Sequence, residues 1–401
     1  MAKQKFAVIG AGIIGSAVGR ALARRHPDAT VTVIEKEDHV AAHQTGRNSG
    51  VVHAGLYYEP GGLKARLCRQ GGIMLKEFCA EKGLPYVECG KLVVALDEIE
   101  EQRLTDIFTR ATANGVPGVA MLGPEGIREI EPNVIGHAAL HSPGTAIVDY
   151  AAITAALAED IVAAGGTVMF GTEVSYIEER DSEAVVHTSR GEVRADHVVV
   201  CAGAQSDRLA RRSGASTQPK IVPFFGQYFL LEPAYRDVLN GLVYPVPDPK
   251  YPFLGVHLTK RFDGEMTVGP NAFLSLSREG YRGLGLSLRD LSETLLDGGF
   301  WRFAGQNASS AVREARSVLS KKFFLREVQK YVPMLEGADA SRLERGIRAQ
   351  AMDARGRLLD DFVIDFEERV THIRNAPSPG ATSSMAIAEH IVDLLGKGGE
   401  D

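Results

Sequence analysis

Phe6-Ala7-Val8-Ile9 runs directly into Gly10-Ala11-Gly12-Ile13-Ile14-Gly15, and this stretch decides the fold of the chain. The four apolar residues are typical of a buried parallel strand, and the G-x-G-x-x-G that follows opens a segment with helical spacing. A second apolar run, Thr30 to Ile34, ends on Glu35. Strand, glycine turn, helix, strand and acid in this order predict a dinucleotide-binding βαβ unit.

Each residue of this unit has a physical reason to bind a dinucleotide. Gly10 permits the tight turn, Gly12 lets a pyrophosphate approach the backbone, and Gly15 lets helix and strand pack closely. The helix N-terminus offers free N–H groups to phosphate, while Glu35 suits a ribose diol and would repel the 2′-phosphate of NADP. The chain has one such motif and no C-x-x-C. We therefore predict a permanently held FAD that is reduced by the substrate itself.

Composition limits the class of protein. The chain has 401 residues, 44% of them hydrophobic, which is enough for two domains, and its net charge of -6 with scattered basic residues argues against a nucleic-acid partner. The N-terminus enters a core strand with no signal-peptide pattern, and no run is long enough to span a bilayer. The four cysteines lack metal-ligand spacing. We expect a cytoplasmic protein with reduced thiols and no metal site.

Segments far apart in the sequence resemble pieces of one parallel sheet. They are the N-terminal unit, an apolar strand at 197–203 that ends on Ala202-Gly203, and a C-terminal strand, loop and helix. This predicts a mixed α/β fold in which residues 1–80, 145–220 and 345–398 form a Rossmann-like FAD-binding domain. Residues 81–144 and 221–344 would be inserted as an antiparallel substrate domain with helices, and Arg278 to Pro333 would be mostly helical.

Two loops are candidates for contact with the flavin. The loop from His43 to Tyr58 is rich in glycine and small polar residues, so its backbone N–H groups can line a ligand, although an ordinary connection would look similar. In the C-terminal loop, Thr382 or Ser383 can cap the helix that follows. That helix N-terminus, aimed at the flavin, would stabilise negative charge on its reduced form; a plain capped helix is the alternative.

The substrate site has three candidate residues. Arg348 lies in an apolar strand, where it can pair bidentately with a substrate carboxylate or form a structural ion pair. Oxidation of an alcohol carbon needs a base, and a histidine of near-neutral pKa suits that role. His53 and His257 are the candidates, although a histidine among apolar neighbours is often a core residue. We favour His53 as the base, with His257 holding the substrate oxygen.

Longer motifs resemble a known family. The motifs are His43-Gln44-Thr45-Gly46-Arg47-Asn48-Ser49-Gly50-Val51-Val52-His53-Ala54-Gly55, Lys64-Ala65-Arg66-Leu67-Cys68, Cys89-Gly90-Lys91-Leu92 and Asn375-Ala376-Pro377-Ser378-Pro379-Gly380-Ala381-Thr382-Ser383-Ser384. They resemble the L-2-hydroxyglutarate oxidase/dehydrogenase family, within the D-amino-acid-oxidase-like FAD-dependent oxidoreductases. The resemblance covers nearly the whole chain and is weakest at 100–135 and 285–340.

The resemblance implies oxidation of L-2-hydroxyglutarate to 2-oxoglutarate with non-covalent FAD, hydride passing from substrate C2 to flavin N5 and electrons going on to oxygen or a quinone. It implies substrate contacts by Arg348, Tyr244 and Gln350. Beyond the glycine motif and Glu35, the implied cofactor contacts are Thr45, Asn48, Ser49, Gly50, Val174, Ala202, Gly203, Ser378, Gly380, Thr382 and Ser383.

Several points stay open at this stage. A dicarboxylate needs a second strong contact, for which the sequence offers Arg47, Arg66, Arg302, Tyr58 or Tyr244. Bacterial members of the family look membrane-associated, so a peripheral contact near residues 298–301 is expected. The alternatives are a related enzyme acting on glycerol 3-phosphate or a secondary amine acid, or a flavin-binding protein of assembly or tRNA modification.

Overall fold

A six-stranded sheet assembled from distant parts of the chain forms the centre of one half of the molecule. The computed structural model describes residues 3–248, 255–282, 285–307 and 321–396. The strand order is β22-β23-β13-β1-β2-β9, and every neighbouring pair is parallel except β22 with β23. The strands are β1 (Lys5–Ile9), β2 (Thr30–Ile34), β9 (Thr167–Met169), β13 (His197–Val200), β22 (Val363–Phe366) and β23 (Val370–Asn375).

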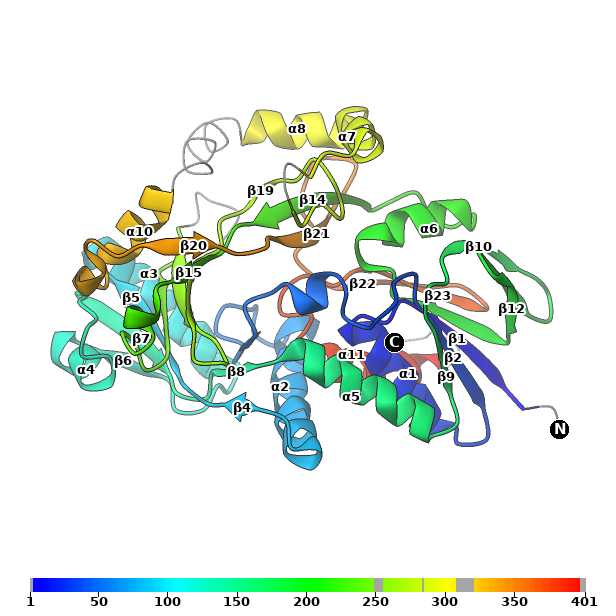
Figure 1. Ribbon diagram of the computed structural model, residues 1–401, viewed down its shortest axis with the longest axis horizontal. Coiled ribbons are helices and arrows are strands. Elements are labelled where there is room, and N and C mark those ends of the chain that lie inside the picture. Colours follow the sequence, from blue (N-terminus) through cyan, green and yellow to red (C-terminus); the bar gives the residue numbers. More distant parts are fainter. Residues whose placement is uncertain (1–2, 249–254, 283–284, 308–320, 397–401) are drawn as a thin grey trace.

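Both faces of this sheet are covered, which explains why the central strands β1 and β13 are apolar at every position after the first. One face packs against helices α1 (Ile13–Arg25), α2 (Leu63–Lys82), α5 (Tyr150–Ala163) and α11 (Ser384–Leu395), which share one apolar core with it (Figure 1). The other face packs against α6 (Ser206–Arg212) and a three-stranded antiparallel sheet of β10 (Val174–Glu179), β11 (Ala184–Thr188) and β12 (Gly191–Ala195).

The other half of the molecule is built on an eight-stranded sheet, which lies on the left in Figure 1. Its order is β20-β15-β18-β17-β16-β5-β7-β6, antiparallel throughout except for the pair β16 and β5. The strands are β5 (Lys91–Ala95), β6 (Ala120–Leu122), β7 (Ala138–Ser142), β15 (Phe229–Leu231), β16 (Leu242–Pro245), β17 (His257–Lys260), β18 (Met266–Gly269) and β20 (Ala340–Arg342). Helix α3 (Glu98–Ala113) covers one face, and α4 (Pro124–Ile130) and α10 (Lys321–Gln329) cover the other.

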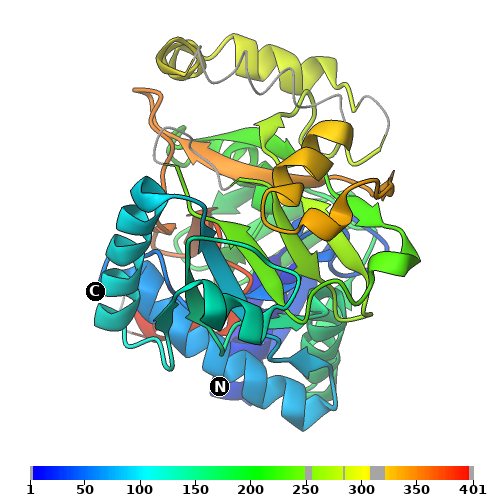
Figure 2. The same ribbon diagram turned by 90° about the vertical axis from the view of Figure 1, so that its left-hand side faces the viewer.

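Two smaller sheets and an outer pair of helices complete the fold. One sheet joins β19 (Phe273–Leu274), β14 (Lys220–Gly226) and β21 (Gly346–Met352); the other joins β3 (Val51–Val52), β8 (Ala146–Val148) and β4 (Tyr86–Val87). Helices α7 (Leu288–Leu295) and α8 (Gly298–Gln306) form the outermost layer at the top of Figures 1 and 2. Short 3-10 turns occur at Gln44–Gly46, Gly203–Gln205, Pro233–Tyr235 and Pro333–Leu335.

The predicted class, a mixed α/β fold with a Rossmann-like unit and an antiparallel sheet, is confirmed. The residue ranges of the two domains stay a prediction. β21, expected in the FAD-binding domain, pairs along its whole length with β14, most of which was expected in the substrate domain. The expectation of helix from Arg278 was wrong for residues 278–282 and 285–287, which form no helix; residues 283–284 lie outside the described residues. Residues 308–320 of that stretch lie outside the described residues.

Candidate functional site

A cavity of about 1200 Å³ lies between the two halves of the molecule and collects most of the expected site residues. This volume exceeds the usual range of small-ligand pockets, about 300–1,000 Å³, and so has room for a dinucleotide beside a substrate. The expected residues that line it are Gly10, Gly12, Gly15, Glu35, Thr45, Asn48, Ser49, His53, Val174, Ala202, Gly203, Tyr244, His257, Arg348, Gln350, Ser378, Gly380 and Thr382. Gly50 and Ser383 do not line it.

The glycine turn fits a pyrophosphate. Gly10 has a φ of +100°, and a Cβ there would lie 2.6 Å from the carbonyl oxygen of Cys201. A Cβ on Gly15 would lie 1.9 Å from the carbonyl oxygen of Gly10, so this close approach of helix and strand requires glycine. At Gly12 the nearest atom to such a Cβ is the Thr45 hydroxyl at 3.4 Å, which leaves its cavity side open to a ligand. Each glycine therefore has the role that a dinucleotide site requires.

Glu35 lies where the ribose of a dinucleotide would be held. Its side chain is buried, and its Oε2 accepts a hydrogen bond of 2.7 Å from the backbone N–H of Ala11. Its Oε1 accepts one of 3.0 Å from the backbone N–H of Glu37. Each carboxylate oxygen can accept a further hydrogen bond, and the residue lines the cavity. The carboxylate is thus fixed in place and retains the capacity to bind hydroxyl groups.

The loop after His43 is held in shape by its own side chains. The Thr45 hydroxyl accepts a 3.0 Å hydrogen bond from the backbone N–H of Ile13, at the start of α1. Asn48 donates to the Thr45 carbonyl at 2.7 Å and accepts from the N–H of Gly50 at 2.8 Å. Gly50 itself has a φ of +70° and belongs to the turn, not to the cavity wall. Thr45 and Asn48 therefore organise the loop as well as lining the cavity.

The C-terminal loop ties the cavity together through Thr382. Its hydroxyl accepts a 3.1 Å hydrogen bond from the backbone N–H of His53 and lies 3.1 Å from the Tyr150 hydroxyl. The expected side-chain cap on α11 was wrong, because Thr382 is engaged elsewhere and Ser383, at the N-cap position, makes no such bond. Within the described residues the buried hydroxyls of Ser383 and Ser384 have no partner, so this helix terminus keeps unused hydrogen-bonding capacity.

His257 is fixed in one tautomer. It is 4% exposed, and its Nδ1 lies 3.0 Å from the carbonyl oxygen of Gly255. A carbonyl can only accept, so Nδ1 carries the proton and Nε2 of the neutral ring is the acceptor. The ring stacks on Tyr244, with centroids 3.8 Å apart. His257 therefore has one nitrogen able to take a proton.

The near-neutral pKa expected for the histidines was wrong. Burial, with the charges of Lys91 and Arg348 among others, lowers the pKa of His53 to about 3. Burial, with the charges of Arg348 and Lys91, also lowers the pKa of His257 to about 3, against the opposing effect of its bond to Gly255. Both rings are therefore neutral at any ordinary working pH, which is the state that a base requires.

Arg348 and Gln350 face the cavity from β21. Arg348 lines the same cavity as His53 and His257, and its charge contributes to lowering the pKa of both histidines. Gln350 donates a 2.9 Å hydrogen bond to the carbonyl of Leu359, so its amide is already used to hold the neighbouring turn. Of these two residues, Arg348 has the chemistry to bind a carboxylate.

The candidates for the second carboxylate contact differ in whether they line the cavity. Tyr58 and Tyr244 line the cavity; Arg66 and Arg302 do not, and Arg302 donates to the carbonyl of Ala354 at 2.6 Å. Arg47 lines the cavity, but its guanidinium lies 3.3 Å from Glu344 and stacks over a tyrosine ring. Its charge is therefore already engaged.

Two lysines near the histidines are not indicated by the residue patterns. Lys64 lines the cavity, and its ammonium binds Asp360 at 2.8 Å. Lys91, on β5, is 2% exposed and lies behind the rings of Tyr57 and Tyr244. Both lysines belong to motifs quoted for the family resemblance, and this membership was the one feature of the sequence that could have placed them at the site.

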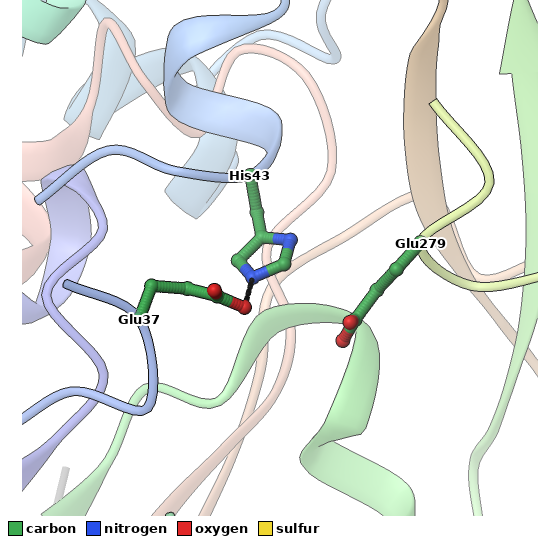
Figure 3. A group of neighbouring side chains, drawn as sticks. All are labelled: Glu37, His43 and Glu279. Carbon is green, nitrogen blue, oxygen red and sulfur yellow. Dashed lines mark hydrogen bonds and ion pairs between the residues drawn. The ribbon is translucent and has the colours of Figure 1, made fainter. Parts of the chain in front are cut away.

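At the rim of the cavity, Glu37, His43 and Glu279 come together (Figure 3). His43 Nε2 lies 3.0 Å from Glu37, and the ammonium of Lys36 lies 3.1 Å from Glu279 and also pairs with Glu37. The Lys36 ammonium supplies the positive charge that a cation would bring. The group is therefore a network of ion pairs that links the end of β2 to the segment that carries Glu279.

Comparisons with known proteins agree with this geometry. The family described as DAO, FAD dependent oxidoreductase, matches residues 5–394. The mitochondrial L-2-hydroxyglutarate dehydrogenase of Homo sapiens is 43% identical over 403 residues, spanning 96% of this chain and 87% of that protein. The L-2-hydroxyglutarate dehydrogenase of Escherichia coli (strain K12) is 42% identical over 391 residues, spanning 97% and 92%.

The chain belongs to the L-2-hydroxyglutarate dehydrogenase family. As a member of this family, within the DAO group, it is an FAD-dependent oxidoreductase. Solved structures share the fold at low identity. An L-alpha-glycerophosphate oxidase from Mycoplasma pneumoniae with FAD bound has a TM-score of 0.77, 23% identity, and coverage of 99% of this chain and 95% of that one. Glycine oxidase from Geobacillus kaustophilus has a TM-score of 0.74 at 21% identity, with 98% and 95% covered.

Family membership confirms two of the expectations drawn from the sequence. The expected family and its FAD cofactor are both confirmed. In the described part of this family member, no helix is long and apolar enough to cross a membrane.

Proposed function

We propose that this member of the L-2-hydroxyglutarate dehydrogenase family oxidises L-2-hydroxyglutarate to 2-oxoglutarate. The observation that carries the proposal is one continuous cavity that runs from the glycine turn to Arg348, His53 and His257. A dinucleotide cradle, a carboxylate-binding arginine and a neutral base are what oxidation of a 2-hydroxy acid needs. The names of relatives more than 40% identical, over nearly the whole chain, support the same substrate.

The chain's own residues divide the work of binding and proton transfer. Gly10, Gly12 and Glu35 would hold the pyrophosphate and ribose of a non-covalent FAD. When bound, FAD supplies the acceptor at N5 for the hydride that leaves the substrate C2 carbon, and its electrons pass on to oxygen or a quinone. Arg348 pairs with the carboxylate beside that carbon and orients it.

The proton of the substrate hydroxyl must leave as the hydride does. His257 is better prepared for this than His53, because its hydrogen bond to Gly255 leaves Nε2 as an acceptor. His53 is held by its backbone, through Thr382, in a position lining the same cavity. We assign the base to His257 and the orientation of the substrate oxygen to His53, which reverses the preference drawn from the sequence.

A peripheral membrane contact through α7 and α8 also forms part of the proposal. In α7 the polar residues Asp290 and Thr294 are buried, while Leu288 is 77% exposed. Leu296 and Trp301, which follow it, are 86% and 58% exposed. This inverted helix lies at the outer edge of the molecule, where apolar side chains can enter a lipid surface (Figures 1 and 2). We propose docking at the cytoplasmic face of the cell membrane.

Anaerobic flavin reduction tests the substrate. L-2-hydroxyglutarate should bleach the yellow protein within one turnover, and the D-enantiomer should not. Glycerol 3-phosphate and sarcosine serve as the substrates of the competing enzymes. Bleaching by either of these, without bleaching by L-2-hydroxyglutarate, would overturn the proposal. Vesicle flotation of the native protein and of the Leu288→Ser/Leu296→Ser variant tests the membrane contact separately.

A further inference from the structure

Lys91 is a charged residue on a face that is otherwise apolar. Along β5, Leu92 and Val94 point to one core of the eight-stranded sheet, and Val93 and Ala95 point to the other. Lys91 falls on the side of Val93 and Ala95 by the alternation of the strand. Its side chain is 2% exposed, so the whole ammonium-bearing chain is inside the protein. Such a position ordinarily holds an aliphatic residue.

The ammonium of Lys91 lies among aromatic rings. Its Nζ lies 4.9 Å from the ring centroid of Tyr57 and 4.9 Å from that of Tyr244. Tyr57 and Tyr244 also line the cavity. The Tyr57 hydroxyl is buried and, within the described residues, has no hydrogen-bond partner. The Lys91 ammonium and the unused Tyr57 hydroxyl donor therefore belong to the same part of the cavity wall.

Among the described residues, the other buried lysines and arginines pair with carboxylates, and Lys91 does not. Arg278 pairs with Asp207, and Arg374 with Asp365. For Lys91 no carboxylate lies within ion-pairing distance in the part of the chain that the structure describes. Attraction to two rings offsets only part of the cost of removing an ammonium ion from water. The site is therefore short of one negative charge until an anion enters the cavity.

We propose that Lys91 is a positioning residue that selects a dicarboxylate: it attracts the second carboxylate of the substrate through the Tyr57 and Tyr244 wall. The inference rests on the proposed function, in which Arg348 binds the first carboxylate. It assigns Lys91 the second charge and leaves direct contact with that carboxylate to the tyrosines. Lys91 touches neither the reacting carbon nor the cofactor site, and it acts on affinity for the distal end of the substrate.

The test compares two ligands that differ only at that end. 2-Oxoglutarate carries a carboxylate where 2-oxopentanoate carries a methyl group. Dissociation constants are measured on the FAD-loaded protein by calorimetry, for the native chain and for Lys91→Met, which keeps the length and removes the charge. Lys76→Met is the matched control, since Lys76 is on the surface of α2 and pairs with Glu88.

The expected result is a change of selectivity. At pH 6, below the lowered pKa of Lys91, Lys91→Met should weaken the binding of 2-oxoglutarate by roughly 10- to 50-fold, the loss expected for a unit charge at about 8 Å in a medium of intermediate dielectric. The dissociation constant of 2-oxopentanoate should stay within about twofold of its native value. Lys76→Met should change neither. Equal weakening of both ligands, or of neither, would overturn the assignment of Lys91. A native protein that does not prefer 2-oxoglutarate would instead overturn the proposed function.

Two further measurements separate selection from a structural role. Replacing an unpaired buried charge by an apolar chain should raise the melting temperature of Lys91→Met, and a lowered one would contradict the proposal. Burial lowers the pKa of Lys91 to about 7, so a bound carboxylate that raises it should draw a proton from solvent at pH 8. Calorimetry in two buffers should detect this uptake with 2-oxoglutarate and lose it in Lys91→Met.

The charged and titratable groups facing Lys91 do not supply that proton uptake. They are His53 from the loop, His257 from β17, Cys68 from α2, and the two tyrosines. The pKa values of the histidines are lowered to about 3, that of Cys68 is raised by burial to about 12, and those of both tyrosines are raised by burial. All five are neutral at pH 8. Uptake that persists in Lys91→Met would therefore contradict the assignment.

Discussion

The imidazole of His257 lies flat on the ring of Tyr244, with the two planes inclined by 19°. The stack presses the histidine against the cavity wall, while the hydrogen bond from Nδ1 to Gly255 fixes its rotation. A base held at two points in this way loses little freedom when the substrate arrives, which is the arrangement that proton transfer favours. Several expectations can be measured on this and neighbouring residues.

Replacing His257 by glutamine should slow anaerobic flavin reduction by roughly 10²–10⁴-fold, because a general base is lost while the FAD stays bound. His53→Gln should have a smaller effect, and His137→Gln, on the surface beside Glu101, should have none. Stopped-flow absorbance gives the three rates. A larger loss in His53→Gln than in His257→Gln would exchange the two roles.

The pH profile of reduction at saturating substrate should be flat on its acid side. A base works when it is neutral, and the pKa of His257, lowered to about 3, keeps it neutral at every pH above about 4. The rate should therefore hold from pH 5 to pH 8. An acid limb near pH 6.5 that disappears in His257→Gln would show that the histidine has its ordinary pKa in the complex.

Arg348→Lys keeps the charge but loses the planar fork that matches a carboxylate. We expect kcat/KM for L-2-hydroxyglutarate to fall by roughly 10- to 100-fold, the value of one or two charge-assisted hydrogen bonds, with the flavin spectrum unchanged. Arg342→Lys, at an exposed position of β20, is the matched control. Kinetics of Arg348→Lys equal to those of that control would return Arg348 to a structural role.

Glu35→Gln should release FAD more readily. The change removes a charge and one acceptor from a carboxylate that already serves two backbone N–H groups. The affinity should fall by roughly ten- to a hundredfold, and the fluorescence of FAD freed on dilution measures it. Glu179→Gln, on an exposed strand, should retain FAD like the native protein. Flavin that stays on the polypeptide after denaturation would contradict the non-covalent attachment.

Arg278→Met should destabilise the fold. Arg278 and Asp207 are both under 10% exposed and hydrogen-bonded at 3.0 Å, so the substitution leaves a carboxylate buried without its partner. The free energy of unfolding in urea should fall by about 3–5 kcal/mol. Arg236→Met, which breaks an exposed pair with Glu265, should cost no more than about 1 kcal/mol. Similar losses in the two variants would contradict this reasoning.

Local patterns were sufficient for the nucleotide unit, because Gly10 to Glu35 forms its contacts within one stretch of chain. The same holds for the continuous apolar runs that mark β1 and β13 as buried strands. Arg348, His53 and His257 could be proposed from residue type and family motifs, and the structure brings them to one cavity.

What the sequence could not supply depends on contacts between distant segments. The pKa of His53 is set by burial and by charges such as Lys91 and Arg348, which arrive from other strands. Thr382 is a good helix cap by its type, yet its hydroxyl is taken by His53, more than three hundred residues away in sequence. The sequence assigns no role to Lys91, because nothing local reveals that β5 lies between β16 and β7 in the sheet or that the Lys91 side chain is buried.

The order of strands in the central sheet has a consequence for biosynthesis. β1 is synthesised well before both of its later partners in the parallel set: its neighbour β13 follows more than 180 residues on, and β23 follows more than 360 residues on. The loop after β23 also carries Thr382, which fixes His53. A nascent chain therefore displays the glycine turn long before it has the strand and loop that complete the cavity, and we expect the flavin to be retained only once β23 and the loop after it have been made.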